Sequence, residues 1–577
     1  MKRIWGGWIL SLMCLCLSAQ TICEQKAQEN VLRFLSSKKL GYEVKASTAK
    51  KSPLTRVYTA KKKGVVAYYV YNVSDGGFVV ASGDEVAAEI LCYSPSGTFD
   101  TTNISPNFQY WLNEYEQQIS FARKIESRPY QNRKSTIGKV GVEPFIKTQW
   151  DQDFPYNIMC PTKKGGNPYY TGCVATAMAQ VMKYYEWPGE GHGAHSYYDI
   201  YNGQLRAATF DGHHYDWNNM LFRYGDSATG IQNNAVAMLM SDCGIAVEMG
   251  YDNDGSAAWS ENIPYALVQY FNYDKAVGQL YHDYCTDNVW SETIYDEVSH
   301  GRPVIFSGLT KNNAGHCFIC DGYQAETDMY HFNWGWGGAC DCYCLLSAVE
   351  GNGYNFKYAQ DIIYGIQPPA EDTKPALSIL AFDGNMDYTI SEESGYTSYS
   401  VVFTSNGEPN IIYNNTWRDV DVIFTMKYEN TANGECAYAK ALDLEFNKYS
   451  FRSIYPLQED EEGYCNYYGE DSIVVRHVLV PQLTPGRYKI ILAYKDYQDK
   501  DLDDESLWKD VETYMDCNNY QTVTKEPTGI ASIAEWHGTQ DNDAIFDLSG
   551  RKVANRQTKG TLPHGIYLMN QRKFVVK

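Results

Sequence analysis

Residues 170–185 read YTGCVATAMAQVMKYY, and Trp187-Pro188 follow directly after Glu186. From Val174 onward, apolar residues recur at positions i, i+3, i+4, i+7, i+8 and i+11, which is the spacing of one face of an α-helix. The residues with this spacing are Val174, Ala177, Met178, Val181, Met182 and Tyr185. We therefore predict a helix that starts beside Cys173, packs on the core and ends before the proline.

Cys173 lies at the first turn of this predicted helix. Unpaired backbone N–H groups and the helix dipole stabilise negative charge at that end, which favours a reactive thiolate. A small buried cysteine, the usual fate of a free thiol, fits the same position. The position on the helix therefore leaves a catalytic and a structural role open, and the decision depends on partners elsewhere in the chain.

A nucleophilic cysteine needs a base and a group that orients the base. Residues 312–323 read NNAGHCFICDGY, so His316 begins an apolar strand directly after a glycine. Residues 330–338 read YHFNWGWGG and place Asn333 on the strand after the next turn. Antiparallel pairing can bring the Asn333 amide beside the His316 ring, and Trp334 can then shield their hydrogen bond from water.

Acyl transfer also requires hydrogen-bond donors for the oxyanion. Residues 149–157 read QWDQDFPYN, and Gln152 in this segment is the candidate donor, together with the backbone N–H of Cys173. The chain order of cysteine, histidine and asparagine, with His316 far downstream of Cys173, is the order found in papain-like proteases.

Four segments resemble a known family in sequence and in order: WDQDFPYN, TGCVATAMAQVMKYYEWP, GHCFICDGY and FNWGWGG. They are similar to the streptopain/interpain family of bacterial papain-fold cysteine proteases. The resemblance implies a papain-like catalytic domain over residues 140–368, with no cofactor. The site residues that it assigns are Cys173 as nucleophile, His316 as general base, Asn333 as its orienter, Trp334 as the shield and Gln152 as oxyanion donor.

The N-terminal part has its own folding pattern. Residues 65–82 read as two strands joined by a turn, and Ser105-Pro106 opens a helix as cap and first-turn proline. Residues 69–85, YVYNVSDGGFVVASGDE, resemble the family's inhibitory pro-domain, to which we assign residues 20–139. The polar, basic stretch that ends this part reads as an exposed linker, and we expect maturation by a cut between Ser127 and Val140. The helix that opens at Ser105-Pro106 has an apolar stripe formed by Phe108, Trp111, Leu112, Tyr115 and Ile119.

Cys317, directly after the histidine, departs from the family pattern, which has a small residue there. A second thiol could oxidise with Cys173 or fill a core site. We favour core filling, because alternate residues of a strand point to opposite faces. The cysteines at 317, 320, 340, 342 and 344 could also suggest a zinc site. Their spacing is irregular and fits one face of a strand equally well, so we expect no metal.

Both ends of the chain carry targeting patterns. A basic start and a short apolar run predict a cleavable signal peptide over residues 1–19. The apolar run is shorter than the roughly 18 apolar residues of a membrane span.

Residues 369–525 alternate like the strands of an accessory β-sandwich domain. Residues 526–577 resemble the sorting-type β-domain of the type IX secretion route of Gram-negative bacteria. A small accessory β-domain without a sorting role is the alternative.

We therefore expect an α+β chain with a pro-domain, a papain-like catalytic domain and C-terminal all-β domains. The net charge of −21 argues against a nucleic-acid partner. The expected function is that of a secreted or cell-surface cysteine endopeptidase, made as a zymogen, that hydrolyses proteins or peptides. Its expected partners are its own pro-domain, as intramolecular inhibitor, and the secretion machinery that reads the tail.

Two other functions fit parts of the sequence. One is a different Cys-His hydrolase, such as a cell-wall amidase or a transglutaminase-like enzyme. The other is an inactive surface adhesin. The pro-segment argues against an amidase, because peptidases need to be silenced before export. The complete set of Cys173, His316, Asn333 and Gln152 argues against an inactive protein.

Overall fold

The structure is a computed structural model in which the chain divides into two compact units, one up to Ala376 and one that begins at Leu377. The signal peptide and most of the expected cleavage segment lie outside the described residues. The structure describes residues 21–37, 53–125, 129–130, 138–163, 165–253, 255–282, 285, 287–309, 315–349, 360–370, 379–381, 385–393, 396–405, 408–409, 412–414, 419–441, 445–451, 469–470, 472–499, 504–511, 520–523, 544–547, 552–555, 565–569 and 572–576.

One antiparallel sheet of ten strands runs through the first unit, in the order β1-β2-β3-β4-β11-β10-β9-β8-β12-β7. The N-terminal strands are β1 Leu54–Lys62, β2 Val65–Val73, β3 Phe78–Ser82 and β4 Ile90–Ser94. The later strands are β7 Gly278–Tyr281, β8 Val304–Leu309, β9 Gly315–Gln324, β10 Met329–Asn333, β11 Cys342–Cys344 and β12 Asp361–Tyr364. The two groups join where β4 pairs with β11, so the N-terminal part extends the catalytic sheet by strand addition. A separate hairpin comprises β5 Ala194–Tyr198 and β6 Leu205–Thr209.

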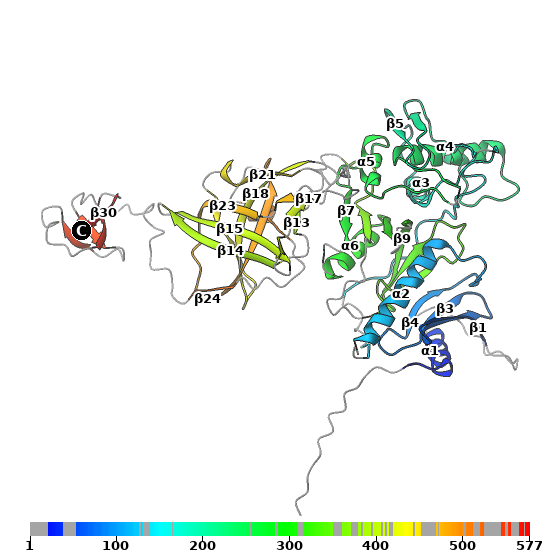
Figure 1. Cartoon of the computed structure of the whole chain (residues 1–577), viewed down its shortest axis with the longest axis horizontal. Helices are drawn as coiled ribbons and strands as arrows, with labels where there is room; N and C mark the ends of the chain where they lie inside the picture. The colour runs from blue at the N-terminus through cyan, green and yellow to red at the C-terminus, as the bar shows by residue number, and fades with distance from the viewer. Residues whose placement is uncertain are drawn as a thin grey trace, which may run out of the picture. The chain divides into compact units, whose positions relative to one another are not determined.

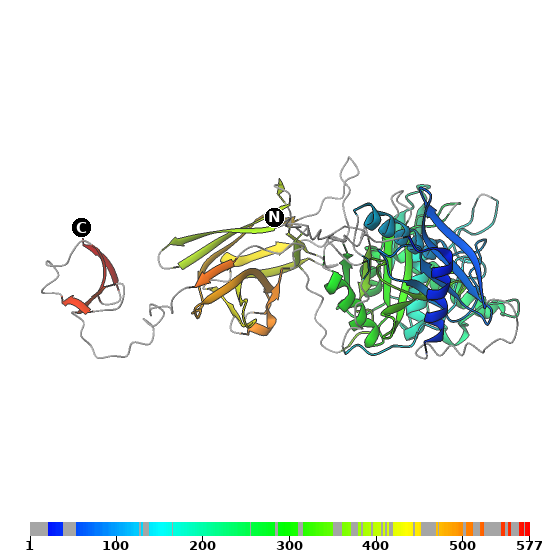
Figure 2. The same cartoon turned by 90° about the horizontal axis from the view of Figure 1, so that it is seen from below.

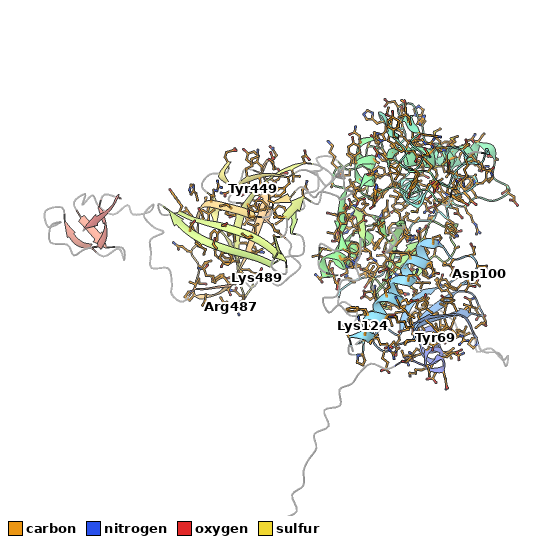
Figure 3. All side chains as sticks on the ribbon, in the orientation of Figure 1. Tyr69, Asp100, Lys124, Tyr449, Arg487 and Lys489 are labelled. Carbon is orange, nitrogen blue, oxygen red and sulfur yellow. The ribbon has the colours of Figure 1, made fainter. Side chains whose placement is uncertain are left out.

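The helices of the first unit are α1 Glu24–Ser36, α2 Pro106–Lys124, α3 Cys173–Tyr185, α4 Gly230–Ala246, α5 Asn262–Gln269 and α6 Asp287–Ser299. Figure 1 shows α2 along the sheet beside β9 and β4, and α3 grouped with α4 and α5. In Figure 2, α1 lies over the N-terminal strands, and it contacts β3 and β4. Figure 3 labels Tyr69 of β2 and Lys124 at the end of α2 within this N-terminal part.

Of the two helices that build the site, α3 spans the predicted range and α2 begins at the predicted Ser105-Pro106 start. In α2, Ser105 Oγ accepts a hydrogen bond from the Phe108 N–H, Pro106 opens the first turn, and the whole predicted apolar stripe is buried. Helix α3 begins at Cys173 and ends in the left-handed Glu186. Residues 174–183 of α3 are all buried, so this helix lies inside the core rather than on its surface.

Two larger sheets of the second unit pack as a β-sandwich, while the bounds 369–525 stay a prediction. A five-stranded sheet includes β14 Asn385–Glu393, β15 Tyr396–Ser405, β16 Glu408–Pro409, β20 Lys440–Ala441 and β23 Ser472–Leu479. A six-stranded sheet includes β18 Val420–Asn430, β19 Cys436–Tyr438, β21 Lys448–Phe451, β24 Gly486–Asp496, β25 Lys509–Asp510 and β26 Tyr520–Val523. Buried residues of both sheets form one core, for example Val401 and Val475 with Phe424 and Leu492.

Smaller strands complete the second unit. A three-stranded sheet comprises β13 Ile379–Ala381, β17 Ile412–Asn414 and β22 Gly469–Glu470. Near the C-terminus, a four-stranded sheet comprises β27 Ala544–Asp547, β28 Lys552–Asn555, β29 Gly565–Met569 and β30 Arg572–Val576. Among the described residues, no helix has the length and apolar character needed to cross a membrane.

Candidate active site

Cys173 is the first residue of α3 and is partly exposed. Gly172 before it has a φ of 87°, and an added Cβ there would lie 2.6 Å from Met249 Sδ, so only glycine fits this turn. The first helical turn is held by Thr176, whose N–H and hydroxyl both donate to the Gly172 carbonyl, at 3.1 Å and 2.9 Å. The sequence therefore places the thiol rigidly at the N-terminus of a buried helix.

The thiol is neutral in this state. Burial raises the pKa of Cys173, and the backbone N–H groups of Cys317, Val174 and Cys173 itself offset only part of that effect. The helix N-terminus acts in the predicted direction, since the N–H groups of Cys173 and Val174 favour the thiolate, as does that of Cys317 on β9. Desolvation of the sulfur is the larger effect, so the precursor holds Cys173 as a poor nucleophile.

His316 lies near the start of β9, next in sequence to Cys317, whose N–H is directed at the Cys173 sulfur. The imidazole is held by α2: its Nδ1 lies 3.1 Å from Asn107 Oδ1, and its ring stacks on Tyr110 at 5.0 Å between centroids. Burial lowers the pKa of His316 to about 4. In the described part of the chain, the ring makes no hydrogen bond to the Cys173 sulfur.

Asn107 is almost fully buried, and both its amide nitrogen and its amide oxygen make hydrogen bonds. Its Nδ2 donates to the carbonyl oxygens of Cys317 at 2.9 Å and Trp334 at 2.8 Å. Because these two bonds fix Nδ2 as the donor, Oδ1 has to accept from His316 Nδ1–H. The neutral imidazole therefore carries its proton on Nδ1, and its Nε2 is unprotonated.

Tyr110 reaches the histidine because the facing strand has no side chain at that register. Gly308 of β8 pairs with His316, and a Cβ on Gly308 would lie 2.3 Å from the Tyr110 hydroxyl oxygen. Sequence reasoning missed both Asn107 and Tyr110. The available signal was an amide in the first turn of an amphipathic helix, and it does not name a partner.

Asn333 is the last residue of β10 and is buried, but its amide hydrogen-bonds to groups other than His316. Its Nδ2 donates to the Thr148 carbonyl at 2.8 Å, while its Oδ1 accepts from Gln180 Nε2 at 3.1 Å and from the Gly335 N–H at 3.0 Å. Among the described residues, no hydrogen bond joins Asn333 to the His316 ring. Gln180 lies on α3, so this network ties the catalytic helix to the end of β10 and was not predicted from sequence.

The other two predicted site residues are Trp334 and Gln152. Trp334 is fully buried, its ring packs on Phe108 and Phe318, and its Nε1 donates to the Cys340 carbonyl at 2.8 Å. The backbone carbonyl of Gln152 accepts from the Thr171 N–H at 3.0 Å. That bond fixes the Gln152 segment beside the turn that leads into the catalytic helix.

Cys317 fills a core site, as predicted, with its side chain 2% exposed in the cluster that surrounds α3. Burial raises the pKa of the Cys317 thiol well above its usual range. Among the described residues, no group of three or more His, Cys, Asp or Glu side chains is arranged to hold a metal ion.

A cysteine at the start of a buried helix, an adjacent histidine and an N-terminal part that immobilises that histidine together define a cysteine peptidase that carries its own inhibitory segment. The chain belongs to the peptidase C10 family, whose profile matches residues 150–344. Residues 19–119 match the Spi protease inhibitor family.

Similar proteins are also proteases. Streptopain of Streptococcus pyogenes is 32% identical over 394 residues, covering 63% of this chain and 96% of streptopain. The thiol protease/hemagglutinin PrtT of Porphyromonas gingivalis is 28% identical over 421 residues, which are 67% of this chain but only 47% of PrtT. A solved fragment of Prevotella intermedia prointerpain A is 34% identical, with a TM-score of 0.49, and covers 56% of this chain and 100% of the fragment.

Proposed function

We propose that the chain is the latent precursor of a cysteine endopeptidase in which Cys173 attacks peptide bonds and His316 moves the protons. One observation carries the proposal. The Cys317 N–H is directed at the Cys173 sulfur, and the neighbouring His316 ring is held by Asn107 and Tyr110 of α2. Cys173 and His316 thus lie on adjacent elements. The segment that matches an inhibitor family holds the His316 ring away from the Cys173 sulfur.

Activation consists of freeing the histidine. A cut between Ser127 and Val140 followed by departure of α2 removes the buried environment that lowers the pKa of His316. The ring then pairs with Cys173 and takes its proton, and we propose that Asn333 replaces Asn107 as acceptor for His316 Nδ1–H. Trp334 excludes water from that bond.

The chemistry follows from this pairing. The thiolate attacks the peptide carbonyl carbon, and the oxyanion accepts hydrogen bonds from the Cys173 N–H and the Gln152 side chain. The imidazolium protonates the leaving amine, which leaves a thioester on Cys173. His316 then takes a proton from water, whose oxygen attacks the thioester carbon. The C–S bond breaks, the carboxylic acid product leaves, and the Cys173 sulfur regains its proton from His316.

Casein hydrolysis by the processed protein tests this function. Cys173→Ala should abolish hydrolysis, and a thiol-alkylating reagent should do the same to the wild type. Cys436→Ala is the matched control, because it removes a free, exposed thiol of the accessory domain by the same substitution and should leave the rate unchanged. Casein hydrolysis by correctly folded Cys173→Ala at the wild-type rate would refute the assignment.

We further propose that the precursor is exported through residues 1–19 and delivered to the cell surface by residues 526–577. The support is the signal-like start and the resemblance of the tail to a sorting domain. A chain that ends at Lys525 should hydrolyse casein normally but remain in the periplasm. Surface delivery of the shortened chain at the normal level would remove the sorting role without affecting the catalytic assignment.

A further inference from the structure

Three thiols that the proposed mechanism does not use lie where the N-terminal strands join the catalytic part of the sheet. Cys92 lies on β4, while Cys342 and Cys344 lie on β11, the neighbouring strand. All three side chains are fully buried. The expected cut, between Ser127 and Val140, falls between these two strands in the chain. The cluster therefore joins two parts that maturation would separate.

The strand register places Cys92 and Cys344 directly opposite each other. The next pair is hydrogen-bonded, since the Leu345 N–H donates to the Leu91 carbonyl at 3.0 Å. Cys92 and Cys344 consequently form a non-hydrogen-bonded pair, in which the Cα atoms are about 4.5 Å apart and side chains are closest. That separation is within the roughly 4.4–6.8 Å that disulfides span. Both cysteines are free in this structure, and their sulfur atoms lie 2.7 Å apart.

The surroundings of Cys92 favour thiol exchange. Burial alone would raise the pKa of the Cys92 thiol, but hydrogen bonds with Cys342, Cys344 and the Tyr115 hydroxyl outweigh burial and lower it to about 6. A thiolate is the form of cysteine that attacks a disulfide. Cys342 Sγ lies 3.5 Å from Cys344 Sγ on the same strand, so it is the nearest competing partner.

We propose that Cys92 and Cys344 form a disulfide in the exported precursor, and that this bond keeps the pro-domain attached to the catalytic domain until a reductant breaks it. The proposal rests on the proposed function, because it concerns release of the proposed inhibitor. Cys92 thiolate attacks one sulfur of a disulfide oxidant of the oxidoreductase or glutathione class and releases a thiol. Cys344 thiolate then attacks the mixed disulfide, so two protein thiols become one disulfide and the oxidant becomes two thiols.

The bond has to form during folding, before β4 and β11 close over the sulfur atoms, and an oxidising compartment outside the cytoplasm sustains it. Because the closed joint buries these sulfurs, reduction requires the two strands to separate locally, which the cut in the linker allows. The disulfide affects the active site because helix α2 and strand β4 both belong to the N-terminal part. Helix α2 holds His316, and β4 belongs to the same part, so a linked pro-domain stays at high effective concentration after the linker is cut. Activation then requires two events, a cut and a reduction. The reductant also keeps the catalytic thiol in its active form.

Peptide mapping of the Cys173→Ala precursor, folded in a glutathione redox buffer and alkylated, tests the bond without requiring peptidase activity. Trypsin yields peptide 64–123, whose only cysteine is Cys92, and peptide 312–357, which contains Cys344. The expected product is the two peptides joined, lighter by two hydrogen atoms than their reduced sum. Cys344→Ala should abolish this species. Cys342→Ala, the matched control on the same strand, should retain it.

Limited tryptic cutting of the basic linker then tests the tether. On a denaturing gel without reductant, the two fragments should migrate as one band, and a dithiol should separate them. Cys92→Ala fragments should separate without reductant. Separation of the wild-type fragments without reductant, or absence of the joined peptides, would overturn the proposal. A joined species that survives in Cys344→Ala would overturn the pairing. Failure of casein hydrolysis would instead overturn the proposed function.

Discussion

Replacing Asn107 with alanine should open the latent site. The side chain makes one hydrogen bond to His316 Nδ1, and its Nδ2 makes two more to backbone carbonyl oxygens of Cys317 and Trp334. A buried hydrogen bond contributes about 1 kcal/mol net, so losing these bonds should favour release of the histidine by about 3 kcal/mol. At about 1.4 kcal/mol for each factor of ten, the open fraction should rise roughly 100-fold.

The rate at which iodoacetamide alkylates Cys173 in the intact precursor measures that fraction. In the closed state burial raises the pKa of the thiol and disfavours the reactive thiolate, whereas the proposed open state would pair the thiol with His316. Tryptic peptide 165–183 has Cys173 as its only cysteine, so mass spectrometry isolates this site from the others. Alkylation inactivates each molecule that reacts. The alkylation rate is therefore read at early time points, before unreacted molecules cleave themselves.

Asn113→Ala is the matched control for this experiment. It is the same substitution on the same helix, but Asn113 is exposed, and among the described residues its Oδ1 accepts a hydrogen bond from Gln109 Nε2 alone, one turn earlier. Its alkylation rate should match that of the wild type. If folded Asn107→Ala precursor is alkylated within twofold of the wild-type rate, the Asn107 contacts do not hold the site closed and the reasoning fails.

Two further predictions concern the mature enzyme and pH. Gln152→Ala should lower kcat about ten- to a thousand-fold with little change in KM, because an oxyanion donor acts in the transition state; a raised KM with unchanged kcat would make Gln152 a binding residue. Burial lowers the pKa of His316 from 6.5 to about 4, so the docked state binds fewer protons than the released state. Docking of α2 should therefore be strongest above pH 6.5 and weaken by at most about 3 kcal/mol as pH falls to 4. Hydrogen exchange of α2 in the Cys173→Ala precursor at pH 7, 5.5 and 4 measures this, and an added His316→Gln should reduce the pH dependence; an identical pH dependence with and without the histidine would contradict it.

The local sequence pattern was enough to predict α2 and α3, the two helices that build the candidate active site. The spacing from Val174 to Tyr185 and the Ser105-Pro106 start each describe one element, and both helices form where predicted. The strands around His316 and Asn333 also form and pair antiparallel, with Asn333 opposite Ile319. These features depend on residues close together in the chain or on simple strand pairing, so the sequence contains the information.

The partner of His316 could not be predicted in the same way. The expected Asn333 amide instead bonds to Thr148 and Gln180, and an asparagine about two hundred positions away in the chain takes the histidine. That choice depends on how α2 lies across the sheet, which no local spacing encodes. Whether Cys173 is charged was also beyond the sequence, because helix position favours the thiolate while burial, a tertiary property, opposes it more strongly.

The sequence by itself therefore determined the main elements of the first unit and predicted Cys173 as nucleophile with His316 as its base, since helix periodicity, capping and motif order are properties of neighbouring residues. Only the tertiary structure decided the state of the site. The pairing of β4 with β11 joins the N-terminal strands to the catalytic sheet, brings Asn107 to the histidine, and sets Cys92 against Cys344. Contacts between distant segments depend on packing and desolvation across the whole unit, and these arise only when the chain has folded.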